Sequence, residues 1–243
     1  MDFKELIQNK RVALVGPAQY LVGSGYGKAI DEHDIVVRIN RGIELISDYR
    51  HDIGERTDIL YSCLLEAAEN AGKQNPESLK EDYKISMICT VPHSDMKGIA
   101  TSTELHYMVN KKTVNKISEL IPVRIIDHQF FTGVSKKINC RPNTGFIAIF
   151  DLLRFQPEQL SVYGFSFYLD GFIPKYKSGI AMAEDEFAKK CLNSKRHVQK
   201  NMWSYCKQTL RDNSRVRLDP YLEEILNLEN FNKEEYKKNE IRY

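Results

Sequence analysis

The sequence contains no apolar run of the ~18 residues that a membrane-spanning helix needs. Its first residues, MDFKELIQNKRVALVG, carry charges where a secretory signal would need an apolar stretch. No block of lysine and arginine is interleaved with aromatic residues, and the formal net charge is only +2, so nucleic acid is not an expected partner. These absences predict a cytoplasmic protein without a signal peptide or a membrane anchor.

Cysteine is also scarce, and its spacing excludes two common uses. None of the cysteines forms a CxxC pair, and their number is odd. The five are Cys63, Cys89, Cys140, Cys191 and Cys206. Reduced thiols in a cytosolic protein explain this pattern better than a disulfide framework or a zinc site, so we predict no metal site.

The chain alternates between short β-branched runs and helical patterns. Strands are predicted at residues 12–16, 34–39, 57–63, 83–91, 122–127 and 159–165. Helices are predicted at residues 103–120, 145–155 and 181–210, the last broken near Asn193, with loops at 75–78 and 128–143. Such alternation predicts an α/β fold with a mostly parallel sheet that helices cover on both faces.

The length of 243 residues suits one large α/β domain, and no repeat or low-complexity linker divides it. We therefore predict a single domain over residues 1–243. Residues 166–200 form a candidate mobile lid, because they hold Gly171, Pro174 and Gly179 among aromatic residues and lysines.

Residues 12–42 predict a strand, a glycine loop, a short helix and a second strand. Gly23, Gly25 and Gly27 permit positive φ angles, and their free N–H groups suit an anion. A Walker A loop is excluded because Ala29 stands where a hydroxyl must bind Mg²⁺. The GxGxxG spacing of dinucleotide sites is also absent, which leaves an NAD-dependent oxidoreductase only as an alternative.

Further polar groups are expected at the carboxyl ends of the strands, where open parallel sheets bind ligands. Asn40 follows the second strand. Asn143 and Thr144 precede an apolar helix, so either can cap it while the first amides of the helix face a phosphate or a ribose oxygen. Gly164 and Phe165 end the last predicted strand and can form the wall of a base pocket. The simpler reading is that these residues are caps, turns and core.

The motifs together resemble those of one family. Residues 12–42 resemble the large sialyl motif of glycosyltransferase family 29, the eukaryotic-type sialyltransferases, through a strand ending in glycine, the run GSGYG and the run RINR. DIGERT, residues 52–57, resembles the end of that motif, and residues 141–165 resemble the small sialyl motif. The motifs follow in the expected order and cover about a third of the chain.

This resemblance implies a Rossmann-like α/β/α sandwich of the GT-A-like kind. It also implies an inverting, metal-independent transfer of sialic acid from a CMP-sugar donor to a glycan or glycolipid hydroxyl, with no cofactor. A CMP-Kdo donor carries the same nucleotide and a similar keto acid, so either sugar is expected. A nucleotide-sugar-binding protein without transferase activity is a further alternative.

By resemblance, His197 is the general base, since an imidazole that titrates near neutral pH can take the proton of the acceptor hydroxyl. Lys175 and Tyr176 occupy the place of the residues that stabilise the leaving phosphate. The residues expected to bind the CMP donor are Ala18, Gln19, Ser24, Asn40, Asn143, Thr144, Gly145, Gly164 and Phe165.

The sequence departs from the family pattern in three places. Pro17 stands where an asparagine is usual, which moves that donor contact to the backbone that follows. Met202 stands where a glutamate should follow His197. Golgi members of the family carry a disulfide, and the matching positions here are near Val12 and Pro157, neither of which is a cysteine. This difference suggests a soluble microbial or viral relative.

Overall fold

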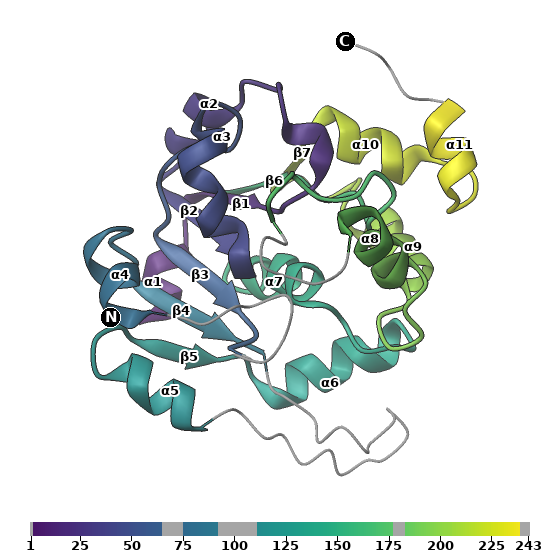
Figure 1. Cartoon of the computed structure of the whole chain (residues 1–243). Helices are drawn as coiled ribbons and strands as arrows, with labels where there is room; N and C mark the ends of the chain where they lie inside the picture. The colour runs from purple at the N-terminus through teal and green to yellow at the C-terminus, as the bar shows by residue number, and fades with distance from the viewer. Residues whose placement is uncertain (1, 65–74, 92–110, 177–182, 239–243) are drawn as a thin grey trace.

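The computed structural model describes residues 2–64, 75–91, 111–176 and 183–238. Its centre is a seven-stranded sheet in the order β5-β4-β3-β2-β1-β6-β7, in which each neighbouring pair is parallel (Figure 1). The strands are β1 (Arg11–Val15), β2 (Ile35–Ile39), β3 (Ile59–Ser62), β4 (Met87–Thr90), β5 (Val123–Ile125), β6 (Gln159–Tyr163) and β7 (Val216–Leu218). The fold is therefore the predicted α/β sandwich.

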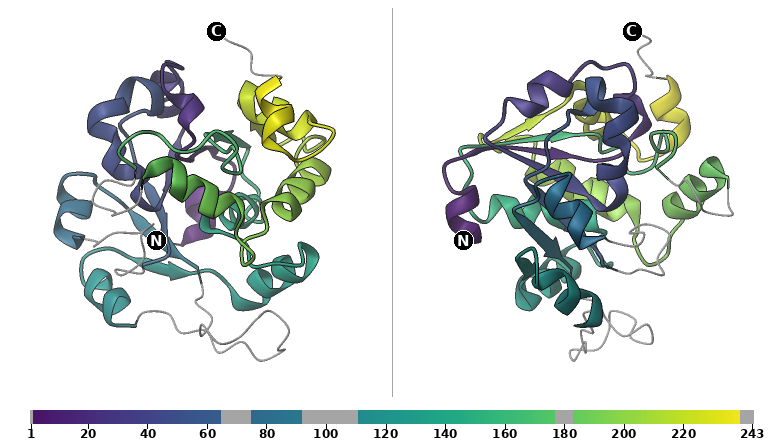
Figure 2. Two further views of the ribbon diagram at one scale, coloured as in Figure 1. Left: turned by 45° about the vertical axis from the view of Figure 1, so that its right-hand side comes forward. Right: turned by 60° about the vertical axis from the view of Figure 1, so that its left-hand side comes forward.

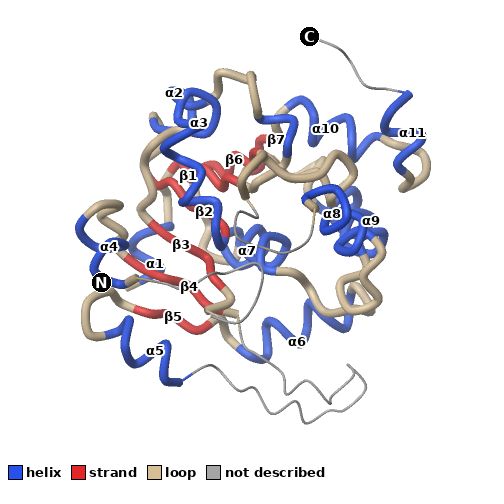
Figure 3. The backbone as a smooth tube through the Cα atoms, in the orientation of Figure 1, coloured by secondary structure: helices blue, strands red, loops and turns tan. Residues whose placement is uncertain are grey.

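Helices cover both faces of this sheet (Figures 2 and 3). One layer contains α1 (Phe3–Ile7), α6 (His128–Lys137), α7 (Thr144–Leu153), α9 (Gln199–Thr209), α10 (Pro220–Asn227) and α11 (Lys233–Lys238). The other contains α2 (Gly27–Asp31), α3 (Ile46–Ile53), α4 (Pro76–Glu81), α5 (Lys111–Ser118) and α8 (Glu184–Leu192). Two 3₁₀ turns follow the first two strands, η1 (Gln19–Leu21) and η2 (Asn40–Leu45).

Strand periodicity creates the two layers of core. In β1, Val12 and Leu14 point toward the α7 layer, while Ala13 and Val15 point toward the α2 layer, and all four are buried. The strands are apolar on both faces because both faces carry helices. In the described residues, no helix has the length and apolar character that crossing a bilayer requires.

The six predicted strands are present, the first shifted by one residue and the other five shorter than predicted, and β7 was not predicted. Two predicted loops are wrong. Residues 76–78 begin α4, and Asn75 caps it, since its side chain accepts hydrogen bonds from the amides of Glu77 and Ser78. Most of 128–143 is α6, which Asp127 caps through the amide of Phe130 at 2.8 Å.

The predicted helix 181–210 is divided as expected, because α8 ends at Leu192 with Asn193 as its C-cap and α9 starts at Gln199. Residues 181 and 182 lie outside the described residues, as do residues 103–110 of the predicted helix 103–120. The single domain and the lid at 166–200 stay predictions.

The order of the strands creates a switch point between β1 and β6. Strands β2 to β5 extend to one side of β1, and the chain then returns to place β6 on the other side. The backbones are close where these two strands end, since a Cβ atom at Gly16 would lie 2.3 Å from the carbonyl oxygen of Gly164. Gly164 also has a φ of +75°. In open parallel sheets, ligands bind at the carboxyl edge at such a point.

Candidate active site

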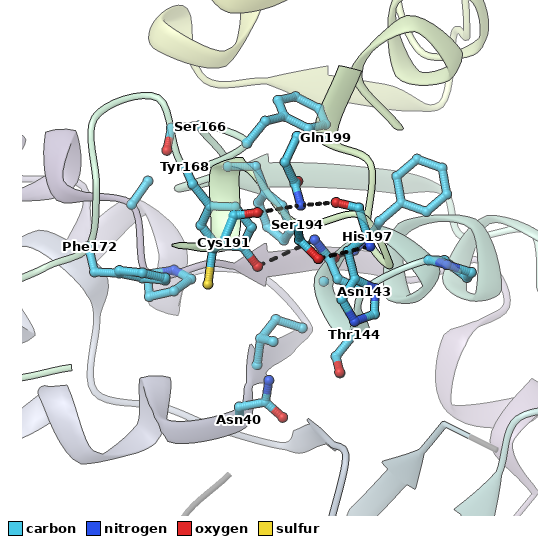
Figure 4. Close-up of a pocket in the computed structure, with 18 of the residues that line it drawn as sticks. Asn40, Asn143, Thr144, Ser166, Tyr168, Phe172, Cys191, Ser194, His197 and Gln199 are labelled. Carbon is cyan, nitrogen blue, oxygen red and sulfur yellow. Dashed lines mark hydrogen bonds between the residues drawn. The ribbon is translucent and has the colours of Figure 1, made fainter. Parts of the chain in front are cut away.

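A cavity of about 360 Å³ opens at this carboxyl edge (Figure 4). Its walls come from the ends of β1, β2, β3 and β6, from the start of α7, and from the segment that joins α8 to α9. Nine of the residues predicted from the sequence contribute to its lining: Ala18, Asn40, Asn143, Thr144, Gly145, Gly164, Phe165, Tyr176 and His197.

The ring of Phe165, in the cavity wall, lies between two glycines. A Cβ atom at Gly145 would lie 2.8 Å from Cε1 of Phe165, and one at Gly16 would lie 3.0 Å from the same ring. The ring therefore packs directly on backbone from β1 and α7. The end of β1 and the start of α7 therefore meet on one aromatic ring.

Asn40 has a strained backbone and a fixed side chain. Its φ is +48°, a conformation that asparagine tolerates better than most residues. Its Oδ1 accepts a hydrogen bond from the amide of Cys63 at 3.1 Å, and its side chain also hydrogen-bonds the hydroxyl of Tyr176. Burial raises the pKa of Tyr176, so this hydroxyl stays protonated and can donate a hydrogen bond.

The start of α7 presents backbone amides to the cavity. Asn143 caps the helix, because its Oδ1 accepts from the amide of Phe146 at 2.8 Å. Its Nδ2 donates to the hydroxyl of Tyr168 at 3.4 Å. The first amides of a helix have no intrahelical acceptor, so those of Thr144 and Gly145 can bind an anion.

His197 is held as a neutral base. Its Nδ1 lies 2.9 Å from the carbonyl oxygen of Arg141, which can only accept, so Nδ1 carries the proton and Nε2 is the free acceptor. Desolvation by burial lowers the pKa of His197 to about 4, and the charges of Arg196 and Arg141 also lower it. The ring is therefore neutral at physiological pH. Figure 4 places it beside Asn143 and Thr144.

Gln199 lines the cavity two residues after His197 and was missed from the sequence. Its Nε2 donates to the carbonyl of His197 at 2.7 Å, which fixes the orientation of the amide. Its Oε1 is buried and accepts no hydrogen bond from the described residues, although the whole residue is only 1% exposed. Buried polar atoms without a partner are rare, so this oxygen sets Gln199 apart among the residues that line the cavity.

Tyr20 and Asp219 fix the Gly164–Phe165 corner from behind. The hydroxyl of Tyr20 donates to Oδ2 of Asp219 at 2.8 Å and accepts from the amide of Phe165 at 2.9 Å. The same Oδ2 accepts from the amide of Gly164 at 2.9 Å, and Oδ1 caps α10 through Leu222. Burial raises the pKa of Asp219 to about 6. No local sequence pattern links these two residues.

Three predicted residues do not line the cavity. Gln19 lies in η1 with its Oε1 near Gly171, and the hydroxyl of Ser24 is 3.5 Å from the carbonyl oxygen of Asp52. Lys175 directs its Nζ toward the carboxylate of Asp48, at 3.3 Å on the exposed surface.

The expectation of free amides in the glycine loop is wrong for Gly23 and Gly25. The carboxylate of Asp52 accepts a hydrogen bond from the amide of Gly25 at 3.0 Å and a further one from the amide of Gly23. An aspartate of the chain therefore occupies the anion position that the loop offers. The glycines shape this loop for packing against α3, where Gly27 contacts the carbonyls of Arg50 and His51.

Arg38 is also structural. It is 1% exposed, and its Nη2 donates to the carbonyls of Ile53 and Gly54 at 2.8 and 2.9 Å. Its Nε donates to the hydroxyl of Thr57 at 2.9 Å. The arginine therefore holds the DIGERT segment onto β2. Among the residues that the structure describes, no group of three or more His, Cys, Asp or Glu side chains is placed to hold a metal ion.

Comparison with known proteins identifies the family. The profile described as glycosyltransferase family 29 (sialyltransferase) matches residues 4–176, well over half of the chain. Similar solved structures include a mammalian sialyltransferase in complex with Gal-beta-1-3GalNAc-ortho-nitrophenol, with 18% identity, a TM-score of 0.48, and coverage of 89% of this chain and 71% of that one. Another is the sialyltransferase CstII from Campylobacter jejuni in complex with the substrate analogue CMP-3FNeuAc, with 12% identity, a TM-score of 0.47, and coverage of 82% and 77%. No curated protein matches the chain. The chain is a glycosyltransferase and belongs to glycosyltransferase family 29, the sialyltransferases.

Proposed function

We propose that this enzyme transfers sialic acid, or the related keto acid Kdo, from a CMP-sugar to a hydroxyl of a glycan or glycolipid, with inversion and without a metal ion. The observation that carries the proposal is the cavity wall in which a neutral His197, with Nε2 as its free acceptor, stands beside the amide-rich start of α7. Family membership supports the CMP-sugar donor and removes the support for an oxidoreductase. The cytoplasmic location and the microbial or viral origin stay predictions.

The donor nucleotide would bind between Asn40, at the end of β2, and the start of α7. Phe165 and Gly164 offer a flat apolar surface for cytosine, and Asn40 offers an amide for the ribose or phosphate. The amides of Thr144 and Gly145 suit the phosphate, because the positive end of a helix dipole favours an anion. Ala18 also lines the cavity, but its amide already donates to the carbonyl of Gly164 at 3.1 Å, so its backbone does not replace the donor contact that Pro17 lacks.

The chemistry needs one proton acceptor and a stabilised leaving group. Nε2 of His197 takes the proton of the acceptor hydroxyl as its oxygen attacks the anomeric carbon of the donor. The bond from that carbon to the phosphate oxygen breaks, and its electron pair leaves with CMP. The neutral hydroxyl of Tyr176 and the first amides of α7 would stabilise this charge. Lys175 lies outside the cavity lining, so we leave it out of this scheme.

Release of CMP tests the proposal. The protein is incubated separately with CMP-sialic acid and with CMP-Kdo, each with and without a glycan acceptor, and free CMP is measured. His197→Gln should lower transfer by ~10²–10⁴-fold, the contribution of a general base. The rise in melting temperature that CMP causes should remain in this variant, because the nucleotide does not need the base. The exposed His128, on α6, provides the matched control as His128→Gln. Normal turnover by His197→Gln would show that another group is the base.

The same assay addresses the binding-protein alternative. Its support is Met202, which stands in α9 where the family pattern predicts a glutamate after His197. Met202 is fully buried in the hydrophobic core. Stabilisation by CMP without release of either sugar to water or to any acceptor would favour that alternative.

A further inference from the structure

The segments on either side of the cavity mouth have an unusual charge composition. Residues 128–150 and 187–211 together contain ten lysines and arginines and no aspartate or glutamate. The chain as a whole is nearly balanced, with 35 basic and 33 acidic residues. The positive charge is thus concentrated in two segments that lie far apart in the sequence.

Four hydrogen bonds join these two segments into one surface. They run from the amide of Arg141 to the carbonyl of Arg196 (3.1 Å), between Nδ1 of His197 and the carbonyl of Arg141 (2.9 Å), from Nδ2 of Asn201 to the carbonyl of Ile138 (2.9 Å), and from Sγ of Cys140 to the carbonyl of Val198 (3.8 Å). We call this surface the basic face and define it by Lys136, Lys137, Arg141, Lys195, Arg196 and Lys200. All but Arg141 are exposed.

The basic face adjoins the proposed reaction centre. Arg141 and Arg196 line the same cavity as His197, and their charges lower its pKa. The acids that precede the two segments, Asp127 and Glu186, stand at the N-terminal ends of α6 and α8, whereas the lysines of those helices stand in their last turns. Of the acids that follow them, Asp151 is buried and pairs with Arg124, and Asp212 lies beyond the far end of α9. Their charges therefore do not lie within the basic face.

Helix stability explains only part of this charge. Lys136 and Lys137 lie in the last turn of α6, where the helix dipole favours cations. Lys195 lies between helices. Lys200 lies in the first turn of α9, where the dipole disfavours a cation, and neither an acid nor a side-chain cap balances it there. Lys195 and Lys200 therefore have no evident role in stabilising the fold.

We propose that the acceptor is an anionic glycan, which carries a phosphate or a carboxylate near the attacking hydroxyl, and that the basic face binds this group. The inference rests on the proposed function, since it concerns the acceptor that reaches His197. An oxyanion bound on the basic face would orient the acceptor and offset the positive electrostatic field of that face. The field also speeds the encounter with an anionic substrate.

The test compares acceptors that differ only in charge. Lactose, lactose with a phosphate monoester and lactose oxidised to its uronic acid are offered with the better donor, and the two anionic forms show whether phosphate or carboxylate is preferred. We expect a KM for at least one anionic form ~10-fold below that of lactose. Lys195→Glu/Lys200→Glu should raise that KM ~10-fold or more, with the KM for lactose and for the donor unchanged. The effect should shrink at high salt, which screens exposed charges.

A control separates local charge from net charge. Lys80 and Lys116 are exposed and lie in the last turns of α4 and α5, across the molecule from α9 (Figures 1 and 2). Lys80→Glu/Lys116→Glu changes the net charge equally and should leave every KM unchanged. Lys136→Glu/Lys137→Glu matches this control in helix position and should behave like the pair at 195 and 200.

Calorimetric binding of the three lactose forms in the presence of CMP needs no turnover, so it keeps this inference separate from the transferase. Selective binding of an anionic form that Lys195→Glu/Lys200→Glu abolishes supports the basic face even if no transfer occurs. Equal binding and use of neutral and anionic lactose overturns it while the transferase stands. Binding to phosphatidylserine vesicles is measured as a last comparison. If Lys195→Glu/Lys200→Glu abolishes vesicle binding and leaves acceptor binding unchanged, the basic face contacts membranes and the inference is wrong.

Discussion

Acidification should lower the free energy of unfolding through His197, because the surroundings of this residue disfavour its charged form. The pKa of His197 is lowered from 6.5 to about 4, mainly because burial disfavours the charged ring. Below pH 6.5 the unfolded chain therefore binds a proton that the folded protein resists. The stabilisation is fully present above pH 6.5 and is lost as the pH falls toward 4. Between about pH 7.5 and about pH 5 the loss is about 2 kcal/mol, from linkage between those two pKa values.

Two carboxyl groups oppose this effect in the same range. Burial raises the pKa values of Asp170 and Asp219 to about 6 each, so they stabilise the fold at low pH and lose this contribution as the pH rises through 6. The wild-type pH dependence alone therefore does not isolate the histidine. The informative quantity is the difference in unfolding free energy between wild type and His197→Gln, in which the carboxyl contributions cancel.

Urea unfolding of both proteins at about pH 7.5 and about pH 5 measures this difference. The stability of the wild type relative to His197→Gln should fall by about 2 kcal/mol on acidification, because only the wild type has the ring to protonate. A difference that stays the same at both pH values would refute the buried, neutral imidazole. It would also remove the reason for assigning Nε2 as the free acceptor.

Three further substitutions test the framework of the site. Tyr20→Phe should lower the unfolding free energy by ~1–3 kcal/mol, measured in urea, and weaken CMP binding, because it leaves the amide of Phe165 without its acceptor. Arg38→Met should lower it by ~3 kcal/mol or more by removing the donor to several buried carbonyls, and the melting temperature should fall with it. Gly145→Ala should cost ~1–3 kcal/mol and weaken CMP binding measured by calorimetry, since its Cβ atom would lie 2.8 Å from the ring of Phe165.

Local patterns in the sequence were sufficient to predict the fold where the signal was strong. The β-branched runs predicted six strands, and Asn143 before an apolar run predicted the start of α7. Helix α6 was missed because its buried side is narrow, with only Phe131 and Val134 buried within the helix. Strand β7 has three residues, of which only Val216 is β-branched, whereas the equally short β5 lies in the run PVRIID with three β-branched residues.

The site could be predicted only where its residues belong to a motif. Asp219 and Tyr20 are 199 residues apart, so no spacing rule connects them. The buried oxygen of Gln199 becomes visible only when every hydrogen-bond partner is known. The glycine loop is a case in which the sequence predicted a site that the structure does not offer. The loop alone suggests an anion site, but the carboxylate of Asp52, 27 residues later in the chain, already binds the amide of Gly25.

The low pKa of His197 has a consequence for the order of events. An imidazole with a pKa of about 4 is a weak base, and two of the groups that lower the pKa are the cations Arg196 and Arg141. A CMP-sugar acid brings a phosphate and a carboxylate into the cavity that these cations line, and a bound anion offsets their charge. Such an anion would relieve the smaller, electrostatic part of the shift, whereas burial, its largest cause, would remain. Since Arg141 and Arg196 belong to the basic face, an anionic acceptor would offset the same two charges and would act on the pKa of His197 in the same direction as the donor.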